Sequence, residues 1–406
     1  LPLIIALFIL FASISLGQTP EQSSSPEKSK TFGSSLEKYK NRGKKDSQSN
    51  PQNGESNNEE VIQVKTSLVV NDVLVTDQNG NIVNGLTKDD FIVTEDNVPQ
   101  NIEMFSFGEN VSSPRSIVII IDTGVTQLPY LKNSIQAAKI LIDKLRPNDK
   151  MAIVSDNLKL LADFTQNKAL LKEALDSITV KYSELTTGRE FTNLLAVLNE
   201  MFSAEDRHRI IISQGSGNGI FSIKTDDETL PNIYKSLQES RGFRGNWKKD
   251  IEFNDIEESI EKSRATIYSI IPGIQVLGLS KKEQFSRAGK SFGNILYEVA
   301  KLRGQPRLSQ PLPYFLQDLE SKRLNFVQTA MFKVATLSGG YTSFLEKPQD
   351  AEIIYSNIFN EFNNRYSIGY YPTNQEQSGN RRTVKIEVRN HPEYKILGRK
   401  TYIPEN

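Results

Sequence analysis

Residues 117–121 read IVIII and run directly into the polar stretch Asp122-Thr123-Gly124-Val125-Thr126. An unbroken apolar run of this length is typical of a strand buried on both faces, and such strands belong to parallel sheets covered by helices. Apolar residues at helical spacing follow, at Leu131, Ile135, Ala138, Ile142 and Leu145. We therefore predict a helix-covered parallel sheet whose first strand ends just before Asp122.

The same alternation of strand and helix continues along the chain. Apolar residues at helical spacing predict helices at 131–145, 170–178, 192–201, 256–263, 324–337 and 351–362. Apolar and β-branched runs predict strands at 151–155, 160–164, 209–213, 266–271 and 341–344. Thr165 is expected to cap the helix that follows it. The fold class predicted for residues 113–364 is therefore α/β, with a doubly wound, mostly parallel sheet.

The segments on either side of this α/β region are rich in β-branched residues and lack a helical period. Residues 61–112 form the first β-rich part and residues 365–406 the second, with 394–402 expected to be a single strand. Neither part has enough strands for a convincing core of its own. We predict one β-sandwich-like module made from both flanks, with the α/β domain inserted between them. Two separate small sheets are the alternative.

The first 60 residues indicate export followed by a tether. Residues 1–17 are almost wholly apolar, too short for an ordinary membrane span, and contain small residues suited to cleavage. A cleaved signal peptide is expected, with an uncleaved membrane anchor as the alternative, although the chain begins at Leu1 rather than Met. Residues 18–60 are polar, with Phe32 and Leu36 nearly alone as apolar residues, and predict a disordered linker. The expected location is the periplasm, the cell surface or the medium.

The composition excludes several chemistries. Lys+Arg is 49 and Asp+Glu is 49, so no net field attracts nucleic acid, and 0 Cys excludes disulfides and thiol catalysis. Of the 2 His, His208 is expected at the surface, at the end of the sheet away from Asp122, and His391 in a hairpin. No hydrolase, metalloprotease or phosphate-loop motif occurs. The sequence predicts a protein that is not an enzyme, and a hydrolase with an unrecognised site is the less favoured alternative.

Several segments together resemble one protein family. The stretches are NGLTKDDFIVTEDNVPQNIEMFSF at 84–107, VATLSGGYTSF at 334–344 and RYSIGYYPTN at 365–374, together with Asp122 at the end of the first core strand. They are similar to von Willebrand factor A domain proteins, and in particular to the acidobacterial-type VWFA-related family of bacteria. The resemblance covers about residues 62–406. It implies the fold predicted above and a role in adhesion or protein binding.

The resemblance also implies a metal-ion-dependent adhesion site, in which Mg²⁺ is completed by a carboxylate of the protein partner. Asp122 and Thr126 match two positions of the family's D-x-S-x-S loop, and Thr192 matches its threonine. Gly124 replaces a serine ligand, and Gln214 replaces the final aspartate. Losing one of two carboxylates weakens the hold on a divalent ion, so a degenerate metal site is expected.

Two alternatives stay open for this loop. A carboxylate on a neighbouring loop, Asp156 or Glu190, compensates for the lost charge, or Asp122 only caps its own loop and the site is vestigial. The Asp122 face is in either case the expected binding edge, because ligands of open α/β sheets bind at the carboxyl ends of the strands.

Long insertions follow two strands on the same side of the sheet, at about 214–255 and 272–322. Long segments of this kind in compact domains are usually functional or disordered. The first contains the candidate partner-binding residues Arg241, Phe243, Arg244 and Trp247, since aromatic and arginine side chains are enriched at binding hot spots. We expect the protein to act in adhesion or protein binding through the Asp122 face, where an acidic side chain of the partner makes the contact. A metal-independent structural or assembly factor of the cell envelope is the alternative.

Overall fold

The central element is a six-stranded sheet with the strand order β10-β9-β8-β5-β6-β7. The structure is a computed structural model, and it describes residues 31–40, 68–108, 114–155, 158–178, 190–203, 205–206, 208–217, 251–302, 304, 313–376 and 379–404. The strands are β5 (Arg115–Ile121), β6 (Lys150–Ser155), β7 (Lys159–Thr165), β8 (His208–Gln214), β9 (Thr266–Pro272) and β10 (Thr342–Leu345). Neighbours are parallel except β6 and β7, so the prediction of a mostly parallel α/β sheet is confirmed.

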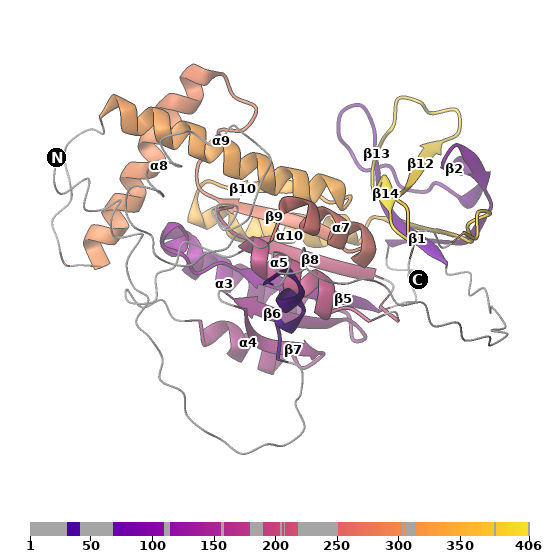
Figure 1. Cartoon of the computed structure of the whole chain (residues 1–406), viewed down its shortest axis with the longest axis horizontal. Helices are drawn as coiled ribbons and strands as arrows, with labels where there is room; N and C mark the ends of the chain where they lie inside the picture. Colours follow the sequence, from indigo (N-terminus) through magenta and orange to yellow (C-terminus); the bar gives the residue numbers. More distant parts are fainter. Residues whose placement is uncertain are drawn as a thin grey trace, which may run out of the picture.

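Helices cover both faces of this sheet (Figure 1). One face carries α3 (Leu128–Asp143), α4 (Lys168–Asp176) and α10 (Ala351–Phe362). The other carries α5 (Glu190–Glu200), α7 (Phe253–Ser263) and α9 (Tyr314–Leu337). Successive side chains of a strand point to opposite faces. Ile117, Ile119 and Ile121 of β5 therefore pack on the first helix layer, and Val118 and Ile120 pack on the second. This explains why residues 117–121 of the strand are apolar at every position.

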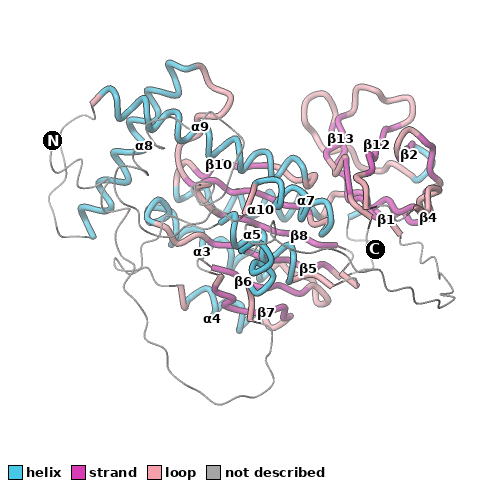
Figure 2. Tube along the Cα trace, in the orientation of Figure 1, coloured by secondary structure: helices cyan, strands magenta, loops and turns pink. Residues whose placement is uncertain are grey.

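Two local predictions were wrong. The cap of α4 is Asn167 rather than Thr165, because the Asn167 side chain accepts hydrogen bonds from the backbone of Ala169 and Leu170. The segment 272–322 is not an open insertion, because it contains α8 (Lys281–Leu302) and the first turns of α9. Together α8 and α9 form a helical hairpin at one end of the sheet (Figure 2).

Part of the predicted linker 18–60 packs on the α/β core, and the prediction is corrected for residues 31–40. They form a short turn of helix, η1 (Ser34–Leu36), followed by α2 (Glu37–Lys40). The side chains of Leu36 and Tyr39 are buried in the cluster that includes α5. The Glu200 carboxylate at the end of α5 accepts hydrogen bonds from the backbone N–H groups of Gly33 and Ser35, both at 2.8 Å. Buried apolar area and a charged hydrogen-bond acceptor together offset the entropy of ordering this segment.

The flanking β-rich parts pair with each other. One four-stranded sheet has the order β13-β1-β11-β4 and the other β14-β12-β2-β3. The strands are β1 (Val69–Thr76), β2 (Phe91–Glu95), β3 (Val98–Gln100), β4 (Ile102–Phe107), β11 (Tyr366–Tyr370), β12 (Arg382–Val388), β13 (Lys395–Leu397) and β14 (Thr401–Tyr402). Each sheet thus combines strands from before and after the α/β region, and both contribute to one apolar cluster. The predicted strand 394–402 is divided between them.

A buried carboxylate links strands of these two sheets. Glu95 of β2 accepts hydrogen bonds from the hydroxyls of Tyr370 and Tyr402, both at 2.8 Å, and from Arg382 Nη1 at 2.9 Å. Tyr370 belongs to the sheet that contains β11, whereas Glu95 belongs to the other. Because every one of these partners comes from the C-terminal flank, the group ties the two ends of the chain together.

Within the described residues, none of the helices has both the length and the apolar character needed to cross a membrane.

Candidate functional site

Asp122 lies at the point where the winding of the sheet reverses. β5 and β8 are adjacent, with Ile121 opposite Gln214. The chain leaves β5 for α3 on one face, and after β8 the next described helix is α7 on the other face. Ligands of open α/β sheets bind in the crevice outside the carboxyl ends of strands at such a switch point. The Asp122 amide donates to the Gln214 carbonyl at 2.9 Å, which holds the two strand ends together.

The Asp122 carboxylate is buried rather than presented to a partner. Its residue is only 1% exposed, and Oδ1 accepts a hydrogen bond from the Gly124 amide at 2.8 Å. The Gln127 amide in turn donates to the Gly124 carbonyl at 2.9 Å, which closes the short helix η5 (Val125–Gln127). Thr126 in this turn is half-buried, and its hydroxyl oxygen accepts from Gln127 Nε2 at 3.3 Å. The carboxylate therefore orders its own loop.

Gln214, which stands where the resemblance places an aspartate, is also fully buried. Its Oε1 accepts a hydrogen bond from the hydroxyl of Tyr355 on α10 at 3.0 Å. Burial raises the pKa of Tyr355 well above that of an exposed tyrosine, so this hydroxyl stays a donor at neutral pH. Tyr355 was not among the sequence-predicted site residues, because nothing in a tyrosine on an apolar helix face indicates a polar partner on a distant strand.

The compensating carboxylate expected at Glu190 lies beside the loop after β8. Glu190 is the first residue of α5 and is 1% exposed, and its Oε1 accepts from the Ser216 hydroxyl at 3.3 Å. A Cβ on Gly215 would come within 2.7 Å of Glu190 Cγ, so only glycine permits this approach. Thr192 follows on the same helix and is half-buried. Asp156, the other expected carboxylate, lies outside the described residues.

The same loop is fixed on its far side by α9. Gly217 has a φ of 78°, in the left-handed region that favours glycine, and a Cβ there would come within 2.7 Å of the Val327 carbonyl. Gly215 and Gly217 after β8 are therefore required by close packing against α5 and α9. The loop lacks the lysine of a phosphate-binding loop, and this packing gives its glycines a structural role instead.

These residues do not fit a magnesium ion. One carboxylate oxygen of Asp122 is held by the Gly124 amide, and the amide oxygen of Gln214 is held by Tyr355. Gly124 offers no side-chain oxygen, and Gln214 offers no charge. Within the part of the chain that is described, no three His, Asp or Glu side chains gather as a metal site would require. Mg²⁺ demands several well-placed oxygen ligands, and these side chains do not supply them.

The α8–α9 hairpin stands over this edge of the sheet. α8 lies against η5 and α3, and α9 packs on β9 and β10. The base of the hairpin is fixed by Gln328 of α9, whose Oε1 accepts from the backbone amides of Val276 and Leu277, both at 2.9 Å. Arg287 of α8 pairs with Glu346 at 2.6 Å, which adds a charged contact. The hairpin is therefore anchored to the strand ends that it covers.

Large aromatic side chains of the hairpin face solvent. Tyr314 is 74% exposed and Phe315 61%, at the start of α9, while Tyr297 and Phe332 are also exposed. The ring of Tyr314 lies tilted against that of Phe285 of α8, with ring centroids 4.6 Å apart. Tyr297, Tyr314 and Phe315 were not among the sequence-predicted site residues, because residues 272–322 were expected to be an insertion without helices. Their signal was the Tyr314-Phe315 pair directly after Pro313. The predicted partner-binding residues Arg241, Phe243, Arg244 and Trp247 lie outside the described residues.

Comparisons with known proteins return von Willebrand factor A domains. No protein-family model matches the chain, and no curated protein matches it. The vWF domain of the type V pili tip protein Mfa5 from Porphyromonas gingivalis is 14% identical, with 62% of this chain and 96% of that one covered and a TM-score of 0.37. BatB from Bacteroides thetaiotaomicron is 11% identical, with 61% and 98% covered and a TM-score of 0.32.

A third similar structure is proximal thread matrix protein 1 from the mussel byssus, with a zinc-occupied MIDAS motif. It is 12% identical, with 60% of this chain and 47% of that one covered and a TM-score of 0.32, so the chain spans about half the length of the mussel protein. At these identities and TM-scores the comparisons establish neither a family nor a function for the chain.

Proposed function

We propose that the chain is an exported, non-enzymatic binding protein that engages a protein partner at the carboxyl edge of its α/β sheet. The exposed aromatic pair Tyr314 and Phe315, on a hairpin anchored over the switch point, is the observation that carries this proposal. Aromatic side chains bring large apolar area to an interface at low entropic cost, and they are enriched at binding hot spots. The buried polar residues beneath, including Asp122, hold the strand ends that support the hairpin.

The charge of the hairpin indicates an acidic partner. Helices α8 and α9 contain eight Lys or Arg residues against four Asp or Glu, whereas the whole chain is balanced at 49 of each. A local excess of one sign steers partners of the opposite sign and selects among them. In an intact adhesion site a metal ion binds the carboxylate of the partner. In this proposal, the Lys and Arg side chains of the hairpin bind the partner's carboxylates instead.

The proposal includes a topology and a location. The α/β domain is a von Willebrand factor A-like domain inserted in a β-sandwich made from both flanks, and its adhesion site is degenerate. The pairing of strands from both flanks and the buried position of Glu95 support the first point. The apolar run at residues 1–17 supports an export signal, and hence a periplasmic, surface or secreted protein.

A second candidate function is that of a structural or assembly factor of the cell envelope. The observation that favours it is the module of two four-stranded sheets at the end of the molecule opposite the hairpin (Figure 1). Such a factor would bind through both ends. The two candidates differ in whether partner binding depends on the hairpin alone.

The test is a pull-down from an envelope extract with immobilised full-length chain, with Mg²⁺ or with a chelator. We compare the wild type with the double variant Tyr314→Ser, Phe315→Ser and use Tyr371→Ser as the control, since Tyr371 is 50% exposed on the β-rich part. The proposal expects a partner that the hairpin variant loses, that the control keeps, and that the chelator leaves unchanged. Retention by the hairpin variant favours the assembly factor, and loss with the chelator contradicts the metal-independent site.

A further inference from the structure

A small cavity lies at the opposite edge of the sheet, where the amino ends of β5, β8 and β9 meet β1 and β11. Its volume is about 20 Å³, and its polar lining includes Asp72, Arg115, Arg146, His208, Tyr268 and Arg365. A cavity needs roughly 10–15 Å³ of such volume to hold one water molecule. The space therefore suits a single particle the size of a water molecule or a monatomic ion.

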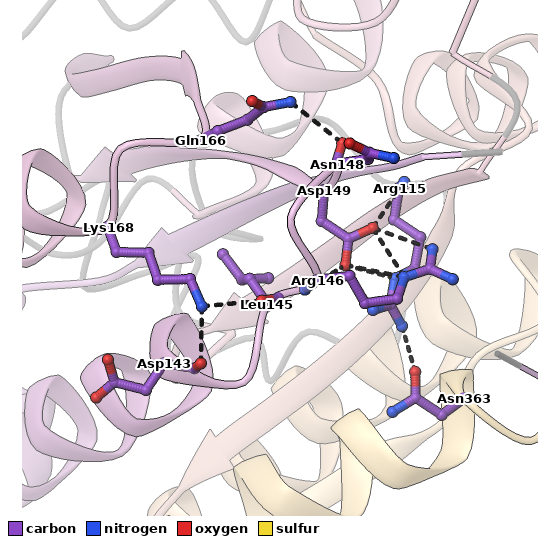
Figure 3. Close-up of polar contacts among 9 residues, drawn as sticks. All are labelled: Arg115, Asp143, Leu145, Arg146, Asn148, Asp149, Gln166, Lys168 and Asn363. Carbon is purple, nitrogen blue, oxygen red and sulfur yellow. Dashed lines mark hydrogen bonds and ion pairs between the residues drawn. The ribbon is translucent and has the colours of Figure 1, made fainter. Parts of the chain in front are cut away.

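Two arginines of the cavity share one carboxylate. Asp149 Oδ2 accepts from Arg115 Nη2 at 2.5 Å, and Oδ1 accepts from Arg146 Nη2 at 3.0 Å. Figure 3 shows the two guanidinium groups converging on the Asp149 side chain. Burial alone would raise the pKa of Asp149, but the hydrogen bonds from Arg115 and Arg146 lower it, so this carboxylate is ionised. Two positive charges thus face one negative charge.

Arg365 supplies a third guanidinium, and one of its nitrogens lacks a partner. Its Nη1 donates to the Asp72 carbonyl at 2.9 Å, and its Nη2 donates to Glu361 Oε1 at 2.5 Å. Its Nε is buried, and no acceptor in the described part of the chain lies within hydrogen-bond distance. The side chain is only 4% exposed, so water from the surface does not reach it freely. A buried N–H of a charged group without an acceptor is costly.

His208 adds positive charge to the same wall, contrary to its predicted position at the surface. It begins β8, away from Asp122 as expected, but it is buried, with Nδ1 3.1 Å from Asp72 Oδ2. Burial lowers the pKa of His208, but the charge of Asp72 and the hydrogen bond to it raise the pKa above its ordinary value. His208 and three arginines therefore face the carboxyl groups of Asp72, Asp149 and Glu361, so that protonation of His208 leaves the cationic groups in excess of the acidic ones.

A further buried cationic side chain, Arg399, interacts electrostatically with Asp72. Arg399 is buried and donates to the Arg264 carbonyl, and its Nε and Nη1 have no acceptor among the described residues. Burial, followed by the charge of Arg264, lowers the pKa of Arg399 to about 9, although Asp72 raises it. Arg365 and Arg399 are thus two buried cationic groups whose remaining donors lack acceptors among the described residues.

We propose that this cavity binds one small inorganic anion, chloride in size, between Arg115, Arg146, His208 and Arg365. The anion supplies the missing acceptor for Arg365 Nε and neutralises the excess charge. Because the cavity walls come from β1 and β11 as well as from β5 and β8, the bound anion stabilises the docking of the β-rich part on the α/β domain. Binding to the folded state alone raises stability with anion concentration.

The test is thermal unfolding of the full chain at constant ionic strength, with gluconate replaced stepwise by chloride. The unfolding midpoint should rise with chloride and level off, because gluconate is too large for the cavity. Arg146→Gln removes a cavity wall whose side chain is partly exposed, so its apparent chloride affinity should fall by about tenfold or more, the usual effect of losing one charged donor. Arg389→Gln, an exposed arginine of the β-rich part, is the control and should keep the wild-type response.

An identical midpoint in chloride and gluconate would overturn the proposal, as would an unchanged chloride response in Arg146→Gln. A second measurement does not depend on a folded variant. Wild-type crystals soaked in bromide should show an anomalous peak inside the cavity. A water molecule there, without anomalous signal, would show that the guanidinium groups are solvated by water and would also overturn the proposal.

Discussion

The ion pair between Asp72 and His208 joins β1 to the start of β8, and we expect its removal to destabilise the fold in a pH-dependent way. The two side chains are 20% and 6% exposed. Burial raises the pKa of Asp72, but the charge and hydrogen bond of His208, with a hydrogen bond from Ser367, lower it from 3.8 to about 2. A shift of nearly two pKa units corresponds to about 2 kcal/mol of unfolding free energy.

The signs define a pH window. The folded pKa of Asp72 is depressed, so its contribution is complete above about pH 3.8 and is lost as the pH falls toward 2. The folded pKa of His208 is raised, so its contribution is complete below about pH 6.5 and is lost as the pH rises through the folded value. The pair should therefore stabilise the protein most between about pH 4 and 6.5.

The assay is urea unfolding of the wild type and of His208→Asn at pH 5 and pH 8.5, in a gluconate buffer of fixed ionic strength. The variant should lose about 2 kcal/mol at pH 5 and less at pH 8.5, because the stabilisation from the charged imidazole is lost as the pH rises through the raised folded pKa of His208. His391→Asn is the matched control, since His391 pairs with Glu393 at 2.9 Å on the surface. Equal losses at the two pH values, or a loss no larger than that of the control, would show that the charged pair does not stabilise the fold.

Three further outcomes are expected. Leu36→Ala should weaken the docking of residues 31–40 by about 2 kcal/mol and speed their cleavage in limited proteolysis, since Leu36 is buried; an unchanged rate contradicts that docking. Glu95→Gln should lower the unfolding free energy by about 1–3 kcal/mol in urea titrations, because Glu95 accepts three buried hydrogen bonds; no measurable loss would be inconsistent with this role. Calorimetry with Mg²⁺ or Mn²⁺ should give no binding heat for the wild type, whereas Gly124→Ser with Gln214→Asp restores two ligands and should give heat; wild-type heat that Asp122→Ala abolishes would show a working site.

Local patterning was sufficient to predict the central sheet. The apolar run at 117–121 is confirmed as a strand buried on both faces, because successive side chains pack on different helix layers. The position of Asp122 at the carboxyl edge followed from the same run, since parallel strands end at one edge. The polar partners at that edge could not be predicted. Tyr355 and Gln214 are 141 residues apart in the chain.

Long-range pairing also explains the error at His208. Its local sequence, a polar turn before a strand, is typical of the surface, and its burial depends on Asp72 in a strand 136 residues earlier. Residues 31–40 were misjudged for the same reason, because Glu200 lies 165 residues or more beyond the amides that it accepts from. A polar segment becomes ordered when a few of its apolar side chains, here Leu36 and Tyr39, pack into an apolar cluster formed elsewhere in the fold.

The helix α8 was missed for a local reason. Its sequence contains Gly289 and Gly293, and glycine within a helix is less favourable than alanine by about 1 kcal/mol. The two glycines interrupt the apolar period and indicate a loop. In the structure, Gly289 instead permits close contact with Gln317 of α9, whose amide carbon would lie 3.2 Å from a Cβ at this position. Packing between the two helices therefore compensates for the weak helical propensity.

In the proposed function, a partner protein contacts the aromatic start of α9. A photo-reactive phenylalanine analogue placed at Phe315 tests it directly, with the same analogue at Tyr371 as the control, since both positions are solvent-exposed. After illumination in an envelope extract, we expect one dominant adduct from position 315, present with or without chelator, and no corresponding adduct from position 371. No adduct from 315, or the same adduct from both positions, would contradict it.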